Sequence, residues 1–335
     1  MDWFIHPSTT GEKLLLMLVA VLIFAAAMGL ILFLVSRVNR PPKWLLAAAF
    51  AGPAVLGLLF GLVYPAITTV KQSFYDAQGT KFIGPDNYVR AVTEDAFQQV
   101  LANTAVWVIL VPLASTAIGL VYAILVDRSR FEKFAKALVF LPMAISMVGA
   151  SIIWKFMYDY KAVIPGVKPE FQNKQIGLLN EILVSLGLEP YNFLLHGPWN
   201  TLFLIVVMIW IQAGFAMTIL SASIKAIPDD IVEAARLDGV SALEMFRHIT
   251  VPSIRPSLVV VLTTIAMGTL KVFDIVRTMT GGQFGTQVVA NEFYTQSFRQ
   301  NNQGLGAALA VILFIIILPL VIYNVRQMRK TEEIR

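Results

Sequence analysis

Residues 226–256 read AIPDDIVEAARLDGVSALEMFRHITVPSIRP, a polar stretch between two strongly apolar ones. It begins with Pro228, Asp229 and Asp230. A proline in the first turn followed by carboxylates at the positive end of the helix dipole is typical of a helix start. The helix is expected to end before Gly239, because glycine accepts the left-handed conformation that terminates many helices. The stretch therefore opens with a short helix of defined ends.

A second short helix is predicted directly after that glycine. Ser241 and Glu244 have the spacing of a capping box, in which each side chain accepts a hydrogen bond from the other residue's backbone N–H. The helix is expected to run through Ile249. Pro252 and Pro256 are then expected to break it before the next apolar block, because proline lacks the N–H and clashes with the preceding turn. The stretch predicts a stiff helix–turn–helix.

Such a pair is better defined than a simple connection requires. Glu233 is expected to be exposed, and the small Ala234 and Ala235 beside it suit docking into a groove of another protein. The alternative is an amphipathic helix that rests on lipid headgroups. The residues of the stretch favour neither interpretation over the other.

The rest of the chain has the composition of a membrane protein. Of its 335 residues, 57% are hydrophobic and 14% charged, with a mean hydropathy of +0.71, whereas soluble domains carry about 25% charged residues. The apolar residues form blocks of about 20, the length that crosses about 30 Å of hydrocarbon. The first block is expected to be a retained helix, with a signal anchor as the alternative. About seven spans are expected, over residues 14–35, 44–67, 100–126, 135–158, 201–223, 257–276 and 305–328.

Basic residues indicate which connections face the cytoplasm. Alternate short connections and the C-terminal tail are rich in Lys and Arg, and the intervening connections are longer and sparser in them. The positive-inside rule therefore places the C-terminus in the cytoplasm and, with seven spans, the N-terminus in the periplasm. If the first block does not span, only the N-terminus changes side. The basic residues are Arg37, Arg40, Lys43, Arg128, Arg130, Lys133, Lys136, Arg326, Arg329, Lys330 and Arg335.

Several kinds of site are excluded or weakly supported. The chain has no cysteine, which excludes disulfides and Cys-ligated zinc, and His6, His196 and His248 lack the spacing of metal ligands. The net charge of +5 fits cytoplasmic loops better than nucleic-acid binding. No GxxxxGK[ST] phosphate loop occurs. We therefore predict no catalytic, cofactor or metal site in this chain, which is not expected to be an enzyme by itself.

The polar stretch resembles the "EAA" signature of binding-protein-dependent ABC importer permeases. The resemblance implies an all-α polytopic membrane protein with the type I ABC importer permease fold, about seven transmembrane helices, and a cytoplasmic coupling helix that seats on an ATPase subunit. It covers about 30 residues, from Ile227-Pro228 to Pro256, with Ile249 among them. The residues expected to form the ATPase-coupling loop, within about 225–256, are Glu233, Ala234, Ala235, Asp238, Gly239, Phe246 and Pro252.

The resemblance continues outside this loop, over about residues 45–330. It points to the larger permease of maltose and α-glucoside importers, although Gln283 stands where that family usually has proline after paired glycines. We expect an extra N-terminal helix and linker over 1–43, the transmembrane domain over 44–330 and a cytoplasmic tail over 331–335. The matching residues are Phe82, Gly84, Asn87, Tyr88, Asn103, Thr104, Leu141, Pro142, Gly177, Leu178, Asn180, Lys271, Val272, Phe273, Asp274, Thr280, Gly281, Gly282, Tyr294 and Phe298.

The resemblance also implies partners and a mechanism. A second permease subunit would complete the pathway, two copies of a nucleotide-binding ATPase subunit would hold the ATP and Mg, and an extracytoplasmic solute-binding protein would deliver the sugar. The complex would work by alternating access in the bacterial inner membrane. The expected substrate is an α-glucoside such as maltose, trehalose or sucrose. A polyol or a glycerol phosphodiester is the alternative substrate for an importer of this kind.

Polar residues within the apolar blocks are candidates for the substrate pathway, because polar groups at membrane depth usually face a cavity or each other. Met208, Gln212 and Phe215 share one helix face. Thr264, Gly268 and Lys271 share another, and helix–helix packing through small residues is an equally good interpretation there. Lys271 has two further options, pairing with Asp274 or reaching the outer interface.

Functions of other classes have less support. An ion-gradient-driven secondary transporter usually shows internal repeats and buried acidic residues. A membrane enzyme requires a nucleophile and base at one depth. The sequence shows neither pattern clearly, and neither function would explain the capped helix–turn–helix.

Overall fold

The structure is a computed structural model that describes residues 9–37, 42–127, 130–162, 166 and 174–333. Its ordered elements are helices, and within these ranges the only β pairing is an isolated bridge between Tyr75 and Phe82. Some residues of the sequence-based predictions lie outside the described ranges, namely His6, Arg40, Arg128 and Arg335. The chain divides into two compact units, Met1–Thr68 and Thr69–Arg335, and each is described by itself.

The first unit is a pair of long apolar helices that expose large hydrophobic side chains. Phe24 is 66% exposed and Trp44 70% exposed, as suits helices surrounded by lipid. Pro53 lies inside the second helix, and a single π-helical turn follows it. The helices of this unit are α1 Thr10–Ser36, α2 Lys43–Leu58 and η2 Leu59–Val63, continued by α3 Tyr64–Gln72 across the unit boundary.

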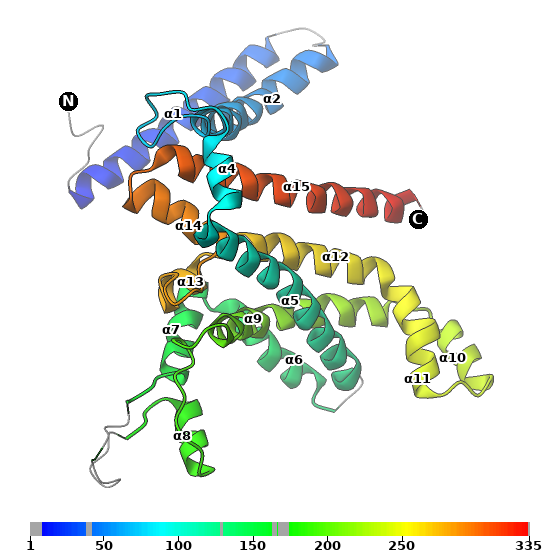
Figure 1. Cartoon of the computed structure of the whole chain (residues 1–335). Helices are drawn as coiled ribbons and strands as arrows, with labels where there is room; N and C mark the ends of the chain where they lie inside the picture. The colour runs from blue at the N-terminus through cyan, green and yellow to red at the C-terminus, as the bar shows by residue number, and fades with distance from the viewer. Residues whose placement is uncertain (1–8, 38–41, 128–129, 163–165, 167–173, 334–335) are drawn as a thin grey trace. The chain divides into compact units, whose positions relative to one another are not determined.

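The second unit holds the remaining helices, with the hydrophobic core between α5, α9 and α12 (Figure 1). Glycines allow the helices of this core to approach each other most closely. A Cβ on Gly119 of α5 would lie 2.6 Å from the Ala216 Cβ of α9, so the two backbones touch in the way that small residues permit in membranes. The helices are α4 Asp86–Thr93, α5 Asp95–Val126, α6 Glu132–Phe140, η3 Leu141–Ala144, α7 Met147–Met157, α8 Leu178–Ser185, α9 Trp199–Lys225, α10 Asp229–Leu237, α11 Ala242–Glu244, η5 Met245–Thr250, α12 Val251–Leu270, α13 Asp274–Met279, α14 Val289–Tyr294, η6 Thr295–Arg299 and α15 Gln303–Glu333.

Six described helices are long and apolar enough to cross a membrane, and a bent pair raises the number to seven. The pair occupies the block predicted as a span over 135–158, and its bend was not part of that prediction. The chain bends by 103° between Glu132–Ala144 and Met147–Met157. The bend has a local cause, because Pro142 lies in a 3₁₀ turn and the Ser146 side chain accepts from the Gly149 N–H to cap a new helix.

The predicted helix break at Pro252 and Pro256 is wrong. The helix runs without interruption from Ala242 to Leu270. The turn before Pro252 is a π-helix, Met245–Thr250. We attribute the continuity to this wider turn, which accommodates a proline that cannot donate to the preceding turn. The span ends at Leu270, earlier than the predicted residue 276, and α13 follows as a separate helix.

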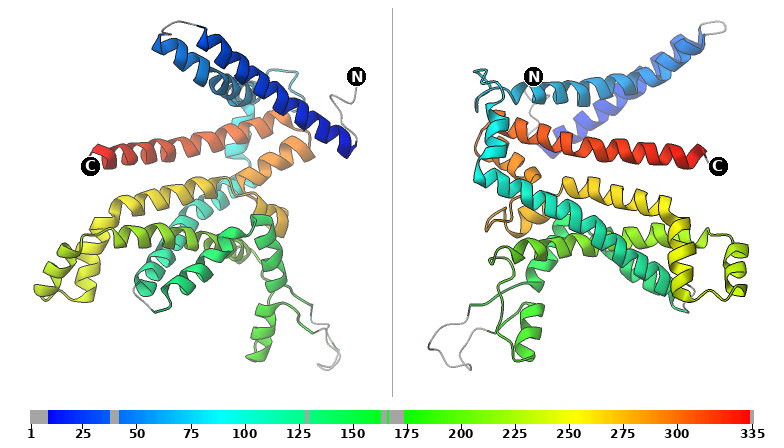
Figure 2. Two further views of the ribbon diagram at one scale, coloured as in Figure 1. Left: turned by 180° about the vertical axis from the view of Figure 1, so that it is seen from behind. Right: turned by 45° about the vertical axis from the view of Figure 1, so that its right-hand side comes forward.

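The two ends of the second unit carry different structures. The short helices α10 and α11 lie at one end of α9 and α12, and α13 lies at the opposite end (Figures 1 and 2). The predicted coupling loop is therefore separated from the loop after α13 by the length of the helix bundle.

Candidate functional site

The stretch 226–256 forms the predicted helix–turn–helix. Pro228 is the N-cap of α10, and Asp229 and Asp230 occupy its first turn. Gly239 has a φ of +76°. Its N–H donates to the Arg236 carbonyl at 3.1 Å and the next N–H donates to the Ala235 carbonyl at 3.2 Å. This is a Schellman motif, and it confirms the predicted glycine stop.

The predicted capping box is also present. Ser241 N–H donates to the Glu244 carboxylate at 2.9 Å, and the Ser241 hydroxyl accepts from Glu244 N–H at 3.4 Å. The turn between α10 and α11 is thus held by contacts within a few residues of each other.

Helix α10 presents most of its surface outward. Ala235 is its one buried residue. Glu233, Ala234, Asp238 and Gly239 are exposed, as is Pro252 further along, and Phe246 is half-buried. Large apolar side chains accompany them, with Leu237 88% exposed and Leu243 74% exposed. An exposed stiff helix with apolar side chains around one carboxylate has the character of a surface that docks on another protein.

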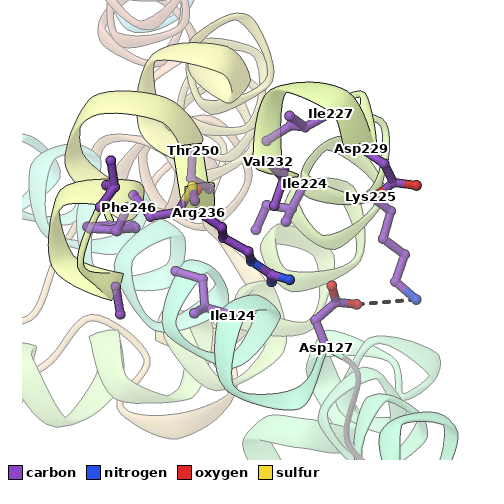
Figure 3. Close-up of a pocket in the computed structure, with 13 residues that line it drawn as sticks. Ile124, Asp127, Ile224, Lys225, Ile227, Asp229, Val232, Arg236, Phe246 and Thr250 are labelled. Carbon is purple, nitrogen blue, oxygen red and sulfur yellow. Dashed lines mark ion pairs between the residues drawn. The ribbon is translucent and has the colours of Figure 1, made fainter. Parts of the chain in front are cut away.

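A cavity of about 740 Å³ lies between α10 and the ends of α5 and α9 (Figure 3). Its walls are mainly aliphatic and its rim is charged. Asp127 forms an ion pair with Lys225 at 3.2 Å. Figure 3 shows the Arg236 side chain of α10 extending toward Asp127. Residues of α11 and η5 also line the cavity, among them Met245 and Phe246.

Charged side chains connect the helix ends around this cavity. Lys136 donates to Glu132 at 2.7 Å and to the Ser221 hydroxyl, and Lys225 also pairs with Glu132. The cluster joins α6 to α9 beside the end of α5. Nothing in the sequence pattern identified it, because its members are separated by up to 93 positions in the chain.

The predicted pathway residues on α9 face the protein interior. Met208 is fully buried in the hydrophobic core, and Phe215 packs against that core. Gln212 is half-buried and has no hydrogen-bond partner among the described residues. An unpaired amide in a membrane helix is costly unless water or a solute reaches it, so the role of Gln212 in the pathway stays a prediction.

The predicted pathway residues on α12 are more open. Thr264 and Lys271 are exposed, and a Cβ on Gly268 would have no heavy atom within 4 Å. In the described part of the chain, no hydrogen bond joins these residues to Gln212 and no ion pair joins Lys271 to Asp274. Their place in the pathway stays a prediction as well.

At the other end of the bundle, loop 280–289 is held by side chains from distant helices. Asn103 of α5 donates to the Gly285 and Gln287 carbonyls at 2.6 and 2.9 Å. Asn200 of α9 donates to the Phe284 carbonyl at 2.7 Å. The resemblance singled out Asn103, but Asn200 was missed, since an asparagine in the first turn of a helix more often caps its own backbone.

A buried polar network holds the same loop from α14. Glu292, 8% exposed, accepts from the amides of Gln287 and Gln296 at 2.5 and 2.6 Å. Asn291 donates to the Gly281 carbonyl at 3.3 Å. Charge-assisted bonds of this kind satisfy a buried carboxylate and fix the backbone around it. The loop is therefore fixed from three helices.

Comparison with known proteins identifies the family. Residues 115–330 match the family described as the binding-protein-dependent transport system inner membrane component. The chain belongs to this family. The capped loop 226–256 lies within the matched residues. The fold is that of an ABC importer permease, and the protein is a multi-pass component of the inner membrane.

Relatives of this permease share most of its length. It is 44% identical over 286 residues to the osmoprotective compounds uptake permease protein GgtC of Synechocystis sp., covering 85% of this chain and 100% of that protein. It is 45% identical over 289 residues to the alpha-glucoside transport system permease protein AglF of Rhizobium meliloti, covering 86% and 82%. Among solved structures, a bacterial ABC transporter that imports the acidic polysaccharide alginate matches with a TM-score of 0.71 and 23% identity, covering 86% of this permease and 96% of that chain.

Proposed function

We propose that this permease is one membrane subunit of an ATP-driven importer for a sugar. In this proposal a second permease completes the pathway, two copies of an ATPase subunit bind ATP and Mg, and an extracytoplasmic solute-binding protein delivers the substrate. The observation that carries the proposal is the 45% identity to an alpha-glucoside permease over 86% of the chain. The solved alginate transporter in complex with its substrate-bound periplasmic protein supports the assembly at the level of the fold.

The proposed coupling element is α10 with the turn that follows it. Glu233 is exposed on a helix whose ends are both fixed by local hydrogen bonds. A stiff helix transmits a displacement of the ATPase to α9 and α12, which a flexible connection would not do. Ala234, Ala235, Asp238, Gly239, Phe246 and Pro252 complete the proposed contact and its support.

The proposed substrate is an α-glucoside such as maltose, trehalose or sucrose. The osmoprotective compounds permease, 44% identical, favours a second candidate, which is an osmoprotective compound of similar polarity. A half-buried amide at Gln212 offers hydrogen bonds to hydroxyl groups, as recognition of such solutes requires. Met208, Phe215, Thr264, Gly268 and Lys271 are the other proposed pathway residues.

The proposed orientation places α10 and the C-terminus in the cytoplasm. Lys133, Lys136 and Lys225 lie at the same end of the bundle as α10, in agreement with the positive-inside rule. The N-terminus would lie in the periplasm if α1 spans the membrane.

The first experiment tests coupling. The tagged permease is purified in mild detergent, and the ATPase activity of the associated subunits is measured. We expect an ATPase and a second permease to co-purify, and Glu233→Lys to abolish both the co-purified ATPase activity and uptake while insertion stays normal. The matched control is Glu181→Lys, the same charge reversal on exposed helix α8, which should retain both. Normal uptake by Glu233→Lys would refute the docking role.

The second experiment tests the substrate and the energy source. Uptake of radiolabelled maltose, trehalose, sucrose, a polyol and a glycerol phosphodiester is measured in proteoliposomes with and without internal ATP. We expect ATP-dependent uptake of an α-glucoside, reduced by Gln212→Ala combined with Lys271→Ala. Uptake by the permease alone on an ion gradient would instead establish a secondary transporter.

A further inference from the structure

A groove of about 510 Å³ lies between α6 and the last turns of α9. Its rim is basic, because Lys133 and Lys136 of α6 and Lys225 of α9 all line it. The two helices run in opposite directions, so these lysines gather at one end of the groove. Small, hydroxyl-bearing and aromatic side chains form the rest of it, namely Ala137, Phe140, Thr218, Ser221 and Ala222.

Two carboxylates lie behind these lysines. Asp127 pairs with Lys225 at 3.2 Å (Figure 3) and with Lys136 at 3.7 Å, and Glu132 accepts from Lys136 at 2.7 Å. The Asp127 side chain is 12% exposed, whereas the Lys225 side chain is 48% exposed. The acidic groups are therefore the more buried ones, and a molecule that enters the groove from outside meets ammonium groups first.

Lys133 supplies a charge that the two carboxylates do not neutralise. It is exposed, and it forms no ion pair with any residue that the structure describes. Three lysines and two carboxylates leave one positive charge in excess at the rim. Because an ammonium group has three N–H donors, Lys133 and Lys225 both keep donors for an anion.

Apolar surface continues from this basic end along α6. Phe134 and Leu138, which flank the groove, are exposed, and α6 lies at the edge of the second unit beside α9 (Figure 1). Exposed apolar side chains on a membrane helix suit contact with acyl chains. An occupant of the groove must therefore carry an anion at one end and apolar chains at the other.

We propose that this groove binds an anionic phospholipid, with its phosphate on Lys133 and Lys225 and its acyl chains along α6. Charge-assisted hydrogen bonds from ammonium groups to phosphate are strong, and basic pockets between membrane helices bind anionic headgroups. A neighbouring permease over the groove would instead bury the excess charge of Lys133, which is costly in a membrane. The inference requires only that the chain spans the membrane, so it is independent of the proposed function.

The test measures which lipid lies beside the groove. The chain has no cysteine, so Leu138→Cys gives one attachment point for a fluorophore. The permease, with any subunits that co-purify, is reconstituted with brominated phosphatidylglycerol or brominated phosphatidylcholine, and quenching is recorded. We expect phosphatidylglycerol to quench at a mole fraction at least about threefold lower than phosphatidylcholine. A fluorophore at Ile315→Cys on α15, also exposed, should be quenched equally by both lipids.

Lys133→Gln tests the excess charge and leaves the Asp127 and Glu132 ion pairs intact. It should remove most of the preference for phosphatidylglycerol. The matched control is Lys155→Gln, which neutralises an exposed lysine of α7 and should retain the preference.

Several outcomes would overturn the proposal. Equal quenching by the two lipids at residue 138, or an unchanged preference in Lys133→Gln, would exclude a specific lipid site. No quenching by either lipid would show that another subunit covers the groove. Loss of the preference on adding inorganic phosphate at constant ionic strength would assign the groove to a soluble anion. None of these measurements requires uptake or ATPase activity, so a failure of the proposed function would leave the test of the lipid site unaffected.

Discussion

The two ends of the helix bundle are built in opposite ways. At one end, α10 and α11 are held by contacts between residues close in the chain, such as the capping pair Ser241 and Glu244. At the other end, loop 280–289 is held by Asn103 and Asn200, which are 182 and 84 positions away from their partners. The first end is held by local contacts, and the second by contacts that form only when the helices pack.

This difference determines how each end would respond to a bound partner. A locally capped helix can move as a body over the cavity beside it and still keep its docking surface. A loop fixed to α5, α9 and α14 moves only when those helices move. A partner bound at the loop would therefore respond to how these helices are arranged. An ATPase bound at α10 would instead change that arrangement. Substitutions at the two ends should separate local from long-range stabilisation.

Gly304→Ala should be severely destabilising. A Cβ at this position would lie 2.0 Å from the Tyr75 carbonyl oxygen and 2.6 Å from that of Asp76, so the backbone at the start of α15 must shift. We expect a loss of about 3 kcal/mol of unfolding free energy, the upper range for overpacking. The measurement is unfolding of the purified protein in an SDS titration. The control is Gly268→Ala, whose new Cβ meets no heavy atom and which should cost nothing.

Two glycines with positive φ compare the two ends directly. Gly282 has a φ of +84° and Gly239 has a φ of +76°, so alanine at either costs about 1 kcal/mol in backbone conformation. At Gly282 the Cβ would also lie 2.1 Å from Gln287 Oε1, which is tied into the Glu292 network. We expect Gly282→Ala to lose about 1 to 2 kcal/mol more than Gly239→Ala.

The measurement for this pair is again unfolding in SDS, with hydrogen exchange to locate the loss. Gly239→Ala should raise exchange only in 226–256. Gly282→Ala should raise exchange in the loop and in α14. Equal losses of stability in the two variants would show that the Gln287 network does not stabilise loop 280–289.

Asn200→Ala should loosen loop 280–289 with a moderate loss of stability. Asn200 is 1% exposed, and its removal leaves the Phe284 carbonyl without its donor, which costs about 1 to 3 kcal/mol. Hydrogen exchange of residues 284–289 should become faster. Asn192→Ala is the control, because within the described part of the chain Asn192 only accepts a local bond of 3.3 Å from the Leu194 N–H. Unchanged exchange in Asn200→Ala would show that the loop is held by the other contacts alone.

The smallest expected effect is a pH dependence at the turn 76–81. Backbone N–H groups of Lys81 and Thr80 hold the pKa of Asp76 below its ordinary value of 3.8. Because the folded pKa is the lower one, the carboxylate stabilises the turn above the ordinary pKa. That contribution disappears as the pH falls from about 4 through the folded pKa. Hydrogen exchange at Thr80, corrected for its intrinsic pH dependence, should show this loss, and Asp76→Asn should abolish it.

The structure explains which sequence-based predictions succeeded. The helix–turn–helix was predicted correctly at Pro228, Gly239 and the Ser241–Glu244 pair, because each signal acts within one turn. The same local reasoning was wrong at Pro252, where a π-helical turn carries the helix onward. Over 135–158, hydropathy indicated a span but could not show the bend at Pro142.

The predicted pathway residues show a second limit of prediction from the sequence. Helical spacing predicted that Met208 and Phe215 share a face that lines the pathway, and in the structure both contact the hydrophobic core. Spacing does not distinguish a core-facing side from a pathway-facing side, since both are apolar in a membrane protein. Gln212, half-buried among these residues, remains the most informative position for the uptake experiment.

The sequence by itself determined the membrane class, the positions of most spans and the capped loop that marks the family. These properties follow from hydropathy and from hydrogen bonds between near neighbours, which are the same in any surroundings. The tertiary structure decided the bend before α7, the ion-pair cluster around Glu132 and the fixed loop with the exposed Phe284. Those features depend on side chains that meet only after the helices pack, and no local pattern encodes which distant residues will meet.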